Sequence, residues 1–220
     1  MPVEITWLGH SCFRLRDRAA TVVTDPYGKD IGLILPRVRA DIVTISHDAD
    51  DHNYVRGVKG EFRVLAGPGE YEVSSVFVTG LELRGSKKKE AAAGPRNTVF
   101  LFEFDDLTVC HLGDLNIVPT QAQVEEALGA VDVLLIPVGG EETLNASQAS
   151  EVVSLLEPHI VIPMHYHVPD IALNLDPVVK FLKEMGLDKV APQESLKVSR
   201  SGLPDETQIV LLELKSKDEA

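Results

Sequence analysis

Cysteine is scarce in this chain, which has 220 residues and only two cysteines, Cys12 and Cys110. Two cysteines do not form the disulfide framework of a small secreted protein, and so sparse a pair is typical of a reducing compartment. We therefore expect a cytoplasmic protein with both thiols buried in its core. The chain also lacks the run of roughly 20 apolar residues that a membrane span needs, and it lacks a signal-peptide pattern at its start.

Basic residues are scarce as well, with 21 lysines and arginines against 34 acidic residues and a formal net charge of −13. Nucleic-acid binding depends on basic side chains that displace counterions, so this balance argues against a nucleic-acid partner. Hydrophobic residues make up 44% of the chain, which is typical of a globular protein. No linker or internal repeat divides the sequence. We expect one domain over residues 1–220, without a membrane partner and with an open oligomeric state.

Short apolar and β-branched runs fill the first half of the chain and predict strands. The predicted strands cover residues 3–8, 12–16, 20–24, 42–45, 63–65, 76–79, 98–104 and 107–111. Residues 67–72 hold two glycines and a proline and are expected to form a fixed turn. Residues 84–97 contain three consecutive lysines and an alanine run, and we interpret them as a mobile surface loop.

In the second half of the chain, apolar residues recur with the spacing of a helix. Thr120 with Gln123 and Asn145 with Gln148 have the spacing of capping boxes, which predicts helices over residues 120–129 and 145–157. A third helix is expected from residue 176 to 186, and strands over residues 131–137, 159–163 and 207–214. Strand meanders followed by βαβ-type units favour a layered α/β fold with helices outside the sheets.

Three of the seven histidines, His47, His111 and His165, stand at the C-terminal ends of predicted buried strands. Ligand sites of α/β sheets gather at that edge. Imidazole and carboxylate together form the ligand set that zinc, iron and manganese prefer. More candidates accompany them: His10, His52, His167, Asp48, Asp50, Asp51 and Asp114. The group predicts a metal site.

Five short motifs give the chain a specific resemblance. Residues 46–53 (SHDADDHN) resemble the HxHxDH signature of the metallo-β-lactamase fold superfamily. Residues 7–11 (WLGHS) with Asp25-Pro26 are similar to the opening of its lactonase-like, metal-dependent hydrolase branch, the branch of L-ascorbate-6-phosphate lactonase. Residues 111–114 (HLGD), 138–140 (VGG) and 163–166 (PMHY) resemble three later motifs in the right order. The resemblance implies a four-layer αββα sandwich with its site along one edge of the two sheets.

The resemblance also implies the ligands. His47 would belong to a first metal position, Asp51, His52 and His165 to a second, and Asp114 would bridge the two. Three further residues are expected to contact substrate or to support the ligands: His10, His111 and Tyr166.

This chain departs from the family pattern at the first metal position. Ala49 replaces the second histidine of HxHxDH, and no histidine lies between His52 and His111. His47 and Asp114 alone do not satisfy a zinc ion that needs three or four protein groups. We therefore expect one ion rather than two, with zinc favoured over manganese or iron. Whether Asp48 or Asp50 replaces the missing ligand or is simply solvated stays open.

The functional expectation is a metal-dependent hydrolase acting on a small lactone, ester or phosphoester. Its metal would lower the pKa of bound water from 15.7 towards about 7 and give a hydroxide that attacks the substrate. Asp51 would act as a catalytic proton carrier. The alternative is a catalytically degenerate member of the superfamily that binds a ligand or partner, because a fold alone does not establish activity.

Overall fold

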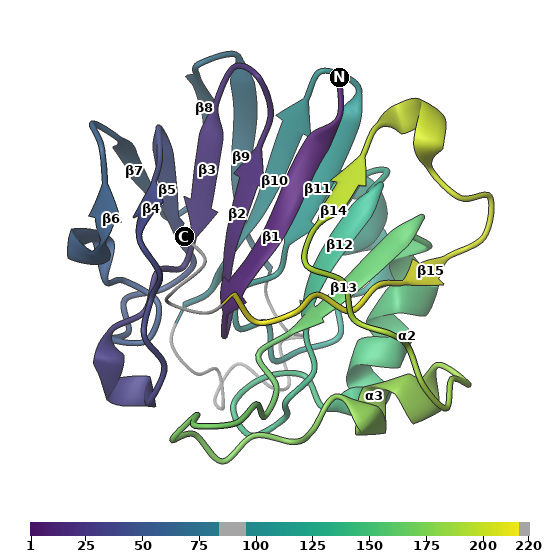
Figure 1. Cartoon of the computed structure of the whole chain (residues 1–220). Helices are drawn as coiled ribbons and strands as arrows, with labels where there is room; N and C mark the ends of the chain where they lie inside the picture. Colours follow the sequence, from purple (N-terminus) through teal and green to yellow (C-terminus); the bar gives the residue numbers. More distant parts are fainter. Residues whose placement is uncertain (84–95, 216–220) are drawn as a thin grey trace.

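The structure is a computed structural model that describes residues 1–83 and 96–215. Two β-sheets lie face to face at its centre (Figure 1). In the N-terminal sheet, β1 pairs antiparallel with β14 and β2, while β3, β5 and β7 run parallel. Its six strands, in spatial order, are β14 (Leu196–Val198), β1 (Val3–Gly9), β2 (Cys12–Arg16), β3 (Thr21–Thr24), β5 (Ile42–Ile45) and β7 (Arg63–Ala66).

The second sheet combines an antiparallel half with a parallel half. Strands β8 to β11 form a meander, and β11, β12, β13 and β15 run parallel. Its seven strands, in spatial order, are β15 (Gln208–Ile209), β13 (Ile160–Met164), β12 (Val133–Pro137), β11 (Leu107–His111), β10 (Thr98–Phe104), β9 (Val76–Glu82) and β8 (Gly69–Val73). A separate two-stranded ribbon pairs β4 (Val38–Arg39) with β6 (Val58–Lys59).

The parallel strands β12 and β13 are buried at every position. Such strands have no polar alternation because one face meets the other sheet and helices cover the opposite face. Helix α2 (Ala146–Leu156) supplies this cover and buries Ala149, Val152 and Val153. Figure 1 shows α2 and α3 (Val179–Glu184) on the side of β12 and β13. The predicted sandwich of the metallo-β-lactamase fold is confirmed.

Both predicted capping boxes are present. The Asn145 side chain accepts a hydrogen bond from the Gln148 backbone at the start of α2, and Thr120 accepts one from Gln123. The second helix of the prediction is thus confirmed, whereas the first is a short α1 (Gln121–Gln123) that continues as a π-helix η4 (Val124–Leu128). In the described residues, no helix is long and apolar enough to cross a membrane.

Three predicted boundaries were wrong. The third helix spans Val179–Glu184 only, because Pro177 and Val178 form its opening turn. The last strand shrinks to Gln208–Ile209, since Pro163 of β13 offers no N–H to the next position of β15. The predicted turn at residues 67–72 is confined to its first residues, and β8 begins at Gly69 because its backbone pairs with β9. The predicted loop at residues 84–97 lies mostly outside the described residues.

The N-terminal sheet has a sparser helical cover than the second sheet. Among the described residues, the connections between β3 and β7 contain two 3₁₀-helices, η1 (Lys29–Ile31) and η2 (Val55–Gly57), and no α-helix. The remaining helical turn of this half of the fold, η5 (Arg200–Gly202), follows β14. Both cysteines are buried as predicted, and burial raises the pKa of each thiol.

Candidate metal centre

Residues from four parts of the chain meet at one edge of the sandwich, where the strands that carry them end. Parallel strands bring their carboxyl ends to a common edge, which is why residues far apart in sequence become neighbours. The cluster consists of His10 between β1 and β2, His47, Asp51 and His52 after β5, Asp114 after β11, and His165 after β13. We refer to these six residues as the His/Asp cluster.

Asp51 lies between two histidines of the cluster. Its Oδ2 atom is 3.2 Å from Nε2 of His10, and its Oδ1 atom is 3.1 Å from Nδ1 of His52. Both imidazole rings are fully buried, while the Asp51 side chain keeps 27% of its surface exposed. Of these three side chains, Asp51 is therefore the one that solvent contacts.

Asp114 lies between three histidines. Its Oδ1 atom is 3.0 Å from Nε2 of His52, and its Oδ2 atom is 3.4 Å from Nε2 of His165 and 3.8 Å from Nε2 of His47. The resemblance implies a bridging role for Asp114, and in the structure each of its carboxylate oxygens lies within 3.8 Å of a histidine nitrogen. Since His52 contacts both carboxylates, it joins the group around Asp51 to the group around Asp114.

The donor atoms of the cluster fit a metal ion. Those of His10, Asp51, His52 and His165 lie within 4.8 Å of one another, as do those of His47, His52 and Asp114. Both ring nitrogens of His52 and Oδ1 of Asp114 are buried without a hydrogen-bond partner among the described residues. The contacts of His52 with Asp51 and Asp114 are therefore short in distance but are not hydrogen bonds, because their angles do not fit one. Buried polar atoms left this way are costly, and a shared cation satisfies them.

The charges of the cluster also favour a cation. Burial disfavours the imidazolium form of His52, but Asp114 and Asp51 outweigh burial and raise the pKa of His52 well above its ordinary value. Burial acts in the opposite direction on Asp114, yet His52 and His165 hold its pKa well below the usual range. Two ionised carboxylates therefore surround His52, so a positive charge is stabilised at this point.

The two outer histidines prefer the neutral form that metal ligation requires. Burial lowers the pKa of His10 from 6.5 to about 4, although its hydrogen bond with Asp51 acts the other way. Burial and the neighbouring His52 likewise lower the pKa of His47. The sequence placed His10 beside the ligands, whereas one of its ring nitrogens lies among the candidate donor atoms. The sequence missed this because His10 belongs to a tight turn, and only the fold directs that turn into the cluster.

Left-handed backbone conformations occur at two cluster residues. His10 has φ 52° and His165 has φ 51°, values that cost energy in residues with a Cβ. Hydrogen bonds compensate, because the His10 carbonyl accepts from Nε1 of Trp7 at 2.9 Å and from the His165 backbone N–H at 3.2 Å. The two histidine turns therefore hold each other in place.

Asp25 is a residue of the site that the sequence showed only as part of a motif. Its buried carboxylate accepts hydrogen bonds from the backbone N–H of Ser46 at 2.7 Å and from its hydroxyl at 2.6 Å. The same hydroxyl lies 3.0 Å from Nδ1 of His47. This chain of contacts orients the His47 ring, as carboxylates behind histidine ligands do in metal sites.

Asn97 is a positioning residue that the sequence analysis missed. Its Oδ1 atom accepts a hydrogen bond from the Asp114 backbone N–H at 2.9 Å, and its Nδ2 atom donates to the Leu112 carbonyl at 2.9 Å. Both bonds bracket Gly113, where φ is 55°. Asn97 thus holds the turn that aims Asp114 at three histidines, and no sequence motif pairs these two segments.

Replacing Asn97 with alanine is expected to lower metal affinity by about 10- to 100-fold, the usual cost of losing a residue that orients a ligand. Metal titration with a competing chelator measures the change. Asn145→Ala is the matched control, because it removes a helix cap, costs about 1 kcal/mol of stability and leaves the cluster intact. An unchanged affinity in Asn97→Ala would mean that Asp114 needs no such support.

The remaining predicted residues lie around the cluster. His111 is buried in the sandwich, where its Nε2 atom lies 2.8 Å from the Ser11 carbonyl, so it supports the fold next to the site. Tyr166 is buried against Trp7, with 5.0 Å between ring centroids. Asp48 is exposed and accepts a hydrogen bond from Asn53. Neither Asp48 nor Asp50 belongs to the donor groups of the described residues.

Together, the two stacked sheets and the histidine and aspartate donors at their edge define a protein of the metallo-β-lactamase fold with a candidate metal centre. The sequence profile of the family described as Beta-lactamase superfamily domain matches residues 4–165, and the chain belongs to this family. The family resemblance inferred from the five motifs is thereby confirmed.

The names of similar proteins agree with this assignment to the metallo-β-lactamase fold. A protein from Thermotoga maritima, described as a candidate zinc-dependent hydrolase of the metallo-β-lactamase superfamily, is 41% identical, with a TM-score of 0.78 and coverage of 96% of this chain and 98% of that one. A UPF0173 metal-dependent hydrolase of Pyrococcus furiosus is 25% identical over 225 residues, covering 89% of this chain and all of the relative. Igni18, a metallo hydrolase of Ignicoccus hospitalis, has a TM-score of 0.65, coverage of 90% and 99% of the two chains, and 22% identity, which shows the fold alone.

Proposed function

We propose that this protein is a metal-dependent hydrolase of small lactone, ester or phosphoester substrates. The observation that carries the proposal is the environment of His52, a fully buried ring between two carboxylates whose nitrogens find no hydrogen-bond partner among the described residues. Such an arrangement is costly unless a cation completes it. The relatives named metal-dependent hydrolases support the same reading.

The ligands in this proposal are His10, Asp51, His52, Asp114 and His165, with His47 at the margin. Three or four of these groups suffice for a single zinc ion with one position open, and manganese or iron accept the same donor types. We favour one ion, because the two donor groups of the described residues share His52 and because Ala49 stands where the family pattern has a second histidine beside His47. The proposal adds His10 to the ligand set that the resemblance implies.

A bound metal supplies a Lewis acid that polarises the scissile group and lowers the pKa of water. Asp51 supplies the proton transfer in our proposal. Its carboxylate is ionised, because the hydrogen bond with His10 and the close contact with His52 outweigh burial and hold the pKa of Asp51 well below its usual range. With 27% of its side chain exposed, Asp51 can take a proton from attacking water at Oδ2 and deliver it to the leaving group. His10 fixes the carboxylate in position.

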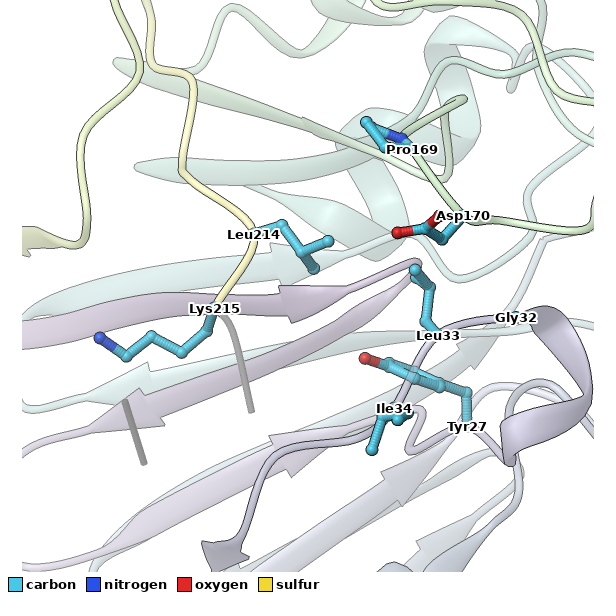
Figure 2. A pocket seen from close by; sticks show the side chains of 8 residues that line it. All are labelled: Tyr27, Gly32, Leu33, Ile34, Pro169, Asp170, Leu214 and Lys215. Atoms are coloured by element: carbon cyan, nitrogen blue, oxygen red, sulfur yellow. The ribbon is translucent and has the colours of Figure 1, made fainter. Parts of the chain in front are cut away.

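A small pocket lies between the segment around η1 and the segments around Pro169 and Leu214, and none of the six cluster residues lines it. Its volume is about 210 Å³, and Figure 2 shows the side chains that line it, among them Tyr27, Leu33 and Leu214. These three side chains surround Gly9, since a Cβ at this position would lie 2.8 Å from both Leu214 and the Tyr27 hydroxyl and 3.3 Å from Leu33. Gly9 immediately precedes His10, so side chains that line this pocket pack against the residue before a cluster member.

The proposal is tested by measuring hydrolysis of a lactone, a nitrophenyl ester and a nitrophenyl phosphodiester with zinc-, manganese- and iron-loaded protein. We expect one substrate class to be hydrolysed, with the activity lost on chelation and restored by metal. Protein that binds about one ion per chain but hydrolyses none of the three classes would contradict the proposal. That result would instead favour a degenerate member that binds a ligand without turnover.

A further inference from the structure

A groove of about 830 Å³ on the N-terminal half of the fold is lined by four arginines. Arg14 and Arg16 stand two residues apart on β2 and thus share a face of that strand. Arg37 and Arg39 flank Val38, which is buried where β4 pairs with β6. Thr21, Ala40, Asp41, Gly60 and Glu61 complete the walls. We call this feature the arginine groove.

The composition of the arginine groove is unusual for so acidic a chain. Four of the ten arginines line it, and no lysine of the described residues does, in a protein with a formal net charge of −13. Arginine differs from lysine in its planar fork of N–H donors, which binds phosphate oxygens in pairs. A surface that needed only solubility would not concentrate arginine in one concave place.

Most of these guanidinium groups lack an acidic partner within the described part of the chain. Arg16, Arg37 and Arg39 are exposed, and no carboxylate of residues 1–83 or 96–215 forms an ion pair with them. Arg14 lies 3.6 Å from Glu4 and donates to Thr6, but its Nε atom is buried without a hydrogen-bond partner. The groove therefore presents several donors that an anion could satisfy.

The walls of the groove are held by backbone contacts. The Asp41 carboxylate accepts a hydrogen bond from the Thr21 backbone N–H at 2.8 Å, so one of the two acids in the lining is already engaged. The Ala40 N–H donates to the Lys59 carbonyl at 3.1 Å. Gly60, with φ of 106°, permits this approach, because a Cβ there would lie 2.9 Å from the Ala40 oxygen. The arginines thus project from a preorganised frame.

The arginine groove is separate from the His/Asp cluster. Thr21 opens β3, Asp41 precedes β5 and Glu61 precedes β7, whereas Asp25 and His47 follow the ends of β3 and β5. Because β3, β5 and β7 are parallel, the groove and the cluster occupy opposite ends of the sheet. A four-residue strand spans roughly 13 Å, so a small molecule at the metal centre does not reach the arginines.

We propose that the arginine groove is a second binding site, which takes a ligand with two or more closely spaced phosphate groups. Several guanidinium groups on one wall match adjacent phosphates better than a single anion. The proposal does not depend on hydrolysis at the His/Asp cluster, so either can fail without the other.

Isothermal titration with inorganic triphosphate tests the proposal on the full chain. Wild-type protein is expected to bind saturably, and Arg37→Gln/Arg39→Gln is expected to weaken binding by at least about tenfold, because each charged hydrogen bond contributes strongly. Arg37→Lys/Arg39→Lys keeps the charge but loses the fork geometry, and we expect it to bind with intermediate affinity. Both residues are exposed, so the variants should fold.

The control variant Lys183→Gln/Lys189→Gln removes the same charge from exposed positions elsewhere and is expected to bind like the wild type. His52→Ala is also expected to keep full triphosphate binding, which excludes capture by the metal centre. The proposal fails if wild-type protein does not bind triphosphate saturably. It also fails if Lys183→Gln/Lys189→Gln loses as much affinity as Arg37→Gln/Arg39→Gln. It also fails if only His52→Ala loses binding, or if a single-stranded oligonucleotide binds in preference to triphosphate.

Discussion

Replacing His52 with alanine is expected to abolish metal binding, with affinity falling more than about 100-fold, and to abolish hydrolysis with it. The ring is fully buried and lies 3.1 Å from Asp51 and 3.0 Å from Asp114. Without it, the two carboxylates face each other with one fewer ligand between them. Metal content by mass spectrometry, on protein purified without added metal, measures the first effect, and the substrate assay measures the second.

His167→Ala is the matched control for this experiment. His167 is exposed and follows His165 by two residues, so its loss removes an imidazole close to the site without removing a donor of the described cluster. We expect this variant to retain about one ion per chain, and His165→Ala to lose it. Metal content that survives in His52→Ala would show that another set of side chains holds the ion.

The Gly139→Ala variant is expected to lose about 3–5 kcal/mol of stability, at the upper end of single substitutions. An added Cβ would lie 2.0 Å from the His165 carbonyl oxygen and 3.1 Å from its carbon, so the backbone itself must move. That movement displaces the turn which carries His165 into the cluster. Urea denaturation measures the stability, and metal titration is expected to show weaker binding in the fraction that folds.

Gly129→Ala separates this clash from the general effect of adding a methyl group. Gly129 has φ of 59° and ψ of −148°, and a Cβ at this position would have no atom of the described residues within 4 Å, so only the backbone conformation opposes alanine there. We expect Gly129→Ala to cost about 1–3 kcal/mol of stability without any effect on metal binding. If Gly139→Ala lost no more stability than Gly129→Ala, the packing of Gly139 against His165 would not be as tight as the structure indicates.

Much of the candidate site was predictable because strand ends are readable in the sequence. His47 and His165 follow continuous apolar runs, and such runs mark strands buried on both faces whose carboxyl ends meet. Asp51, His52 and Asp114 came from motifs that match a known pattern in order. The same reasoning missed strand and helix ends, for example β15, where the absence of an N–H at Pro163 decides how far the pairing extends.

The amino-acid sequence by itself determined the fold class and the identity of most metal-ligand candidates, because both depend on local periodicity and on short motifs. Only the tertiary structure decided that His10 joins the cluster, that Asn97 holds the Asp114 turn and that four arginines share one groove. Each of these depends on a distance between segments far apart in the chain. Sheet register and backbone turns set such distances, and no local pattern of residues encodes them.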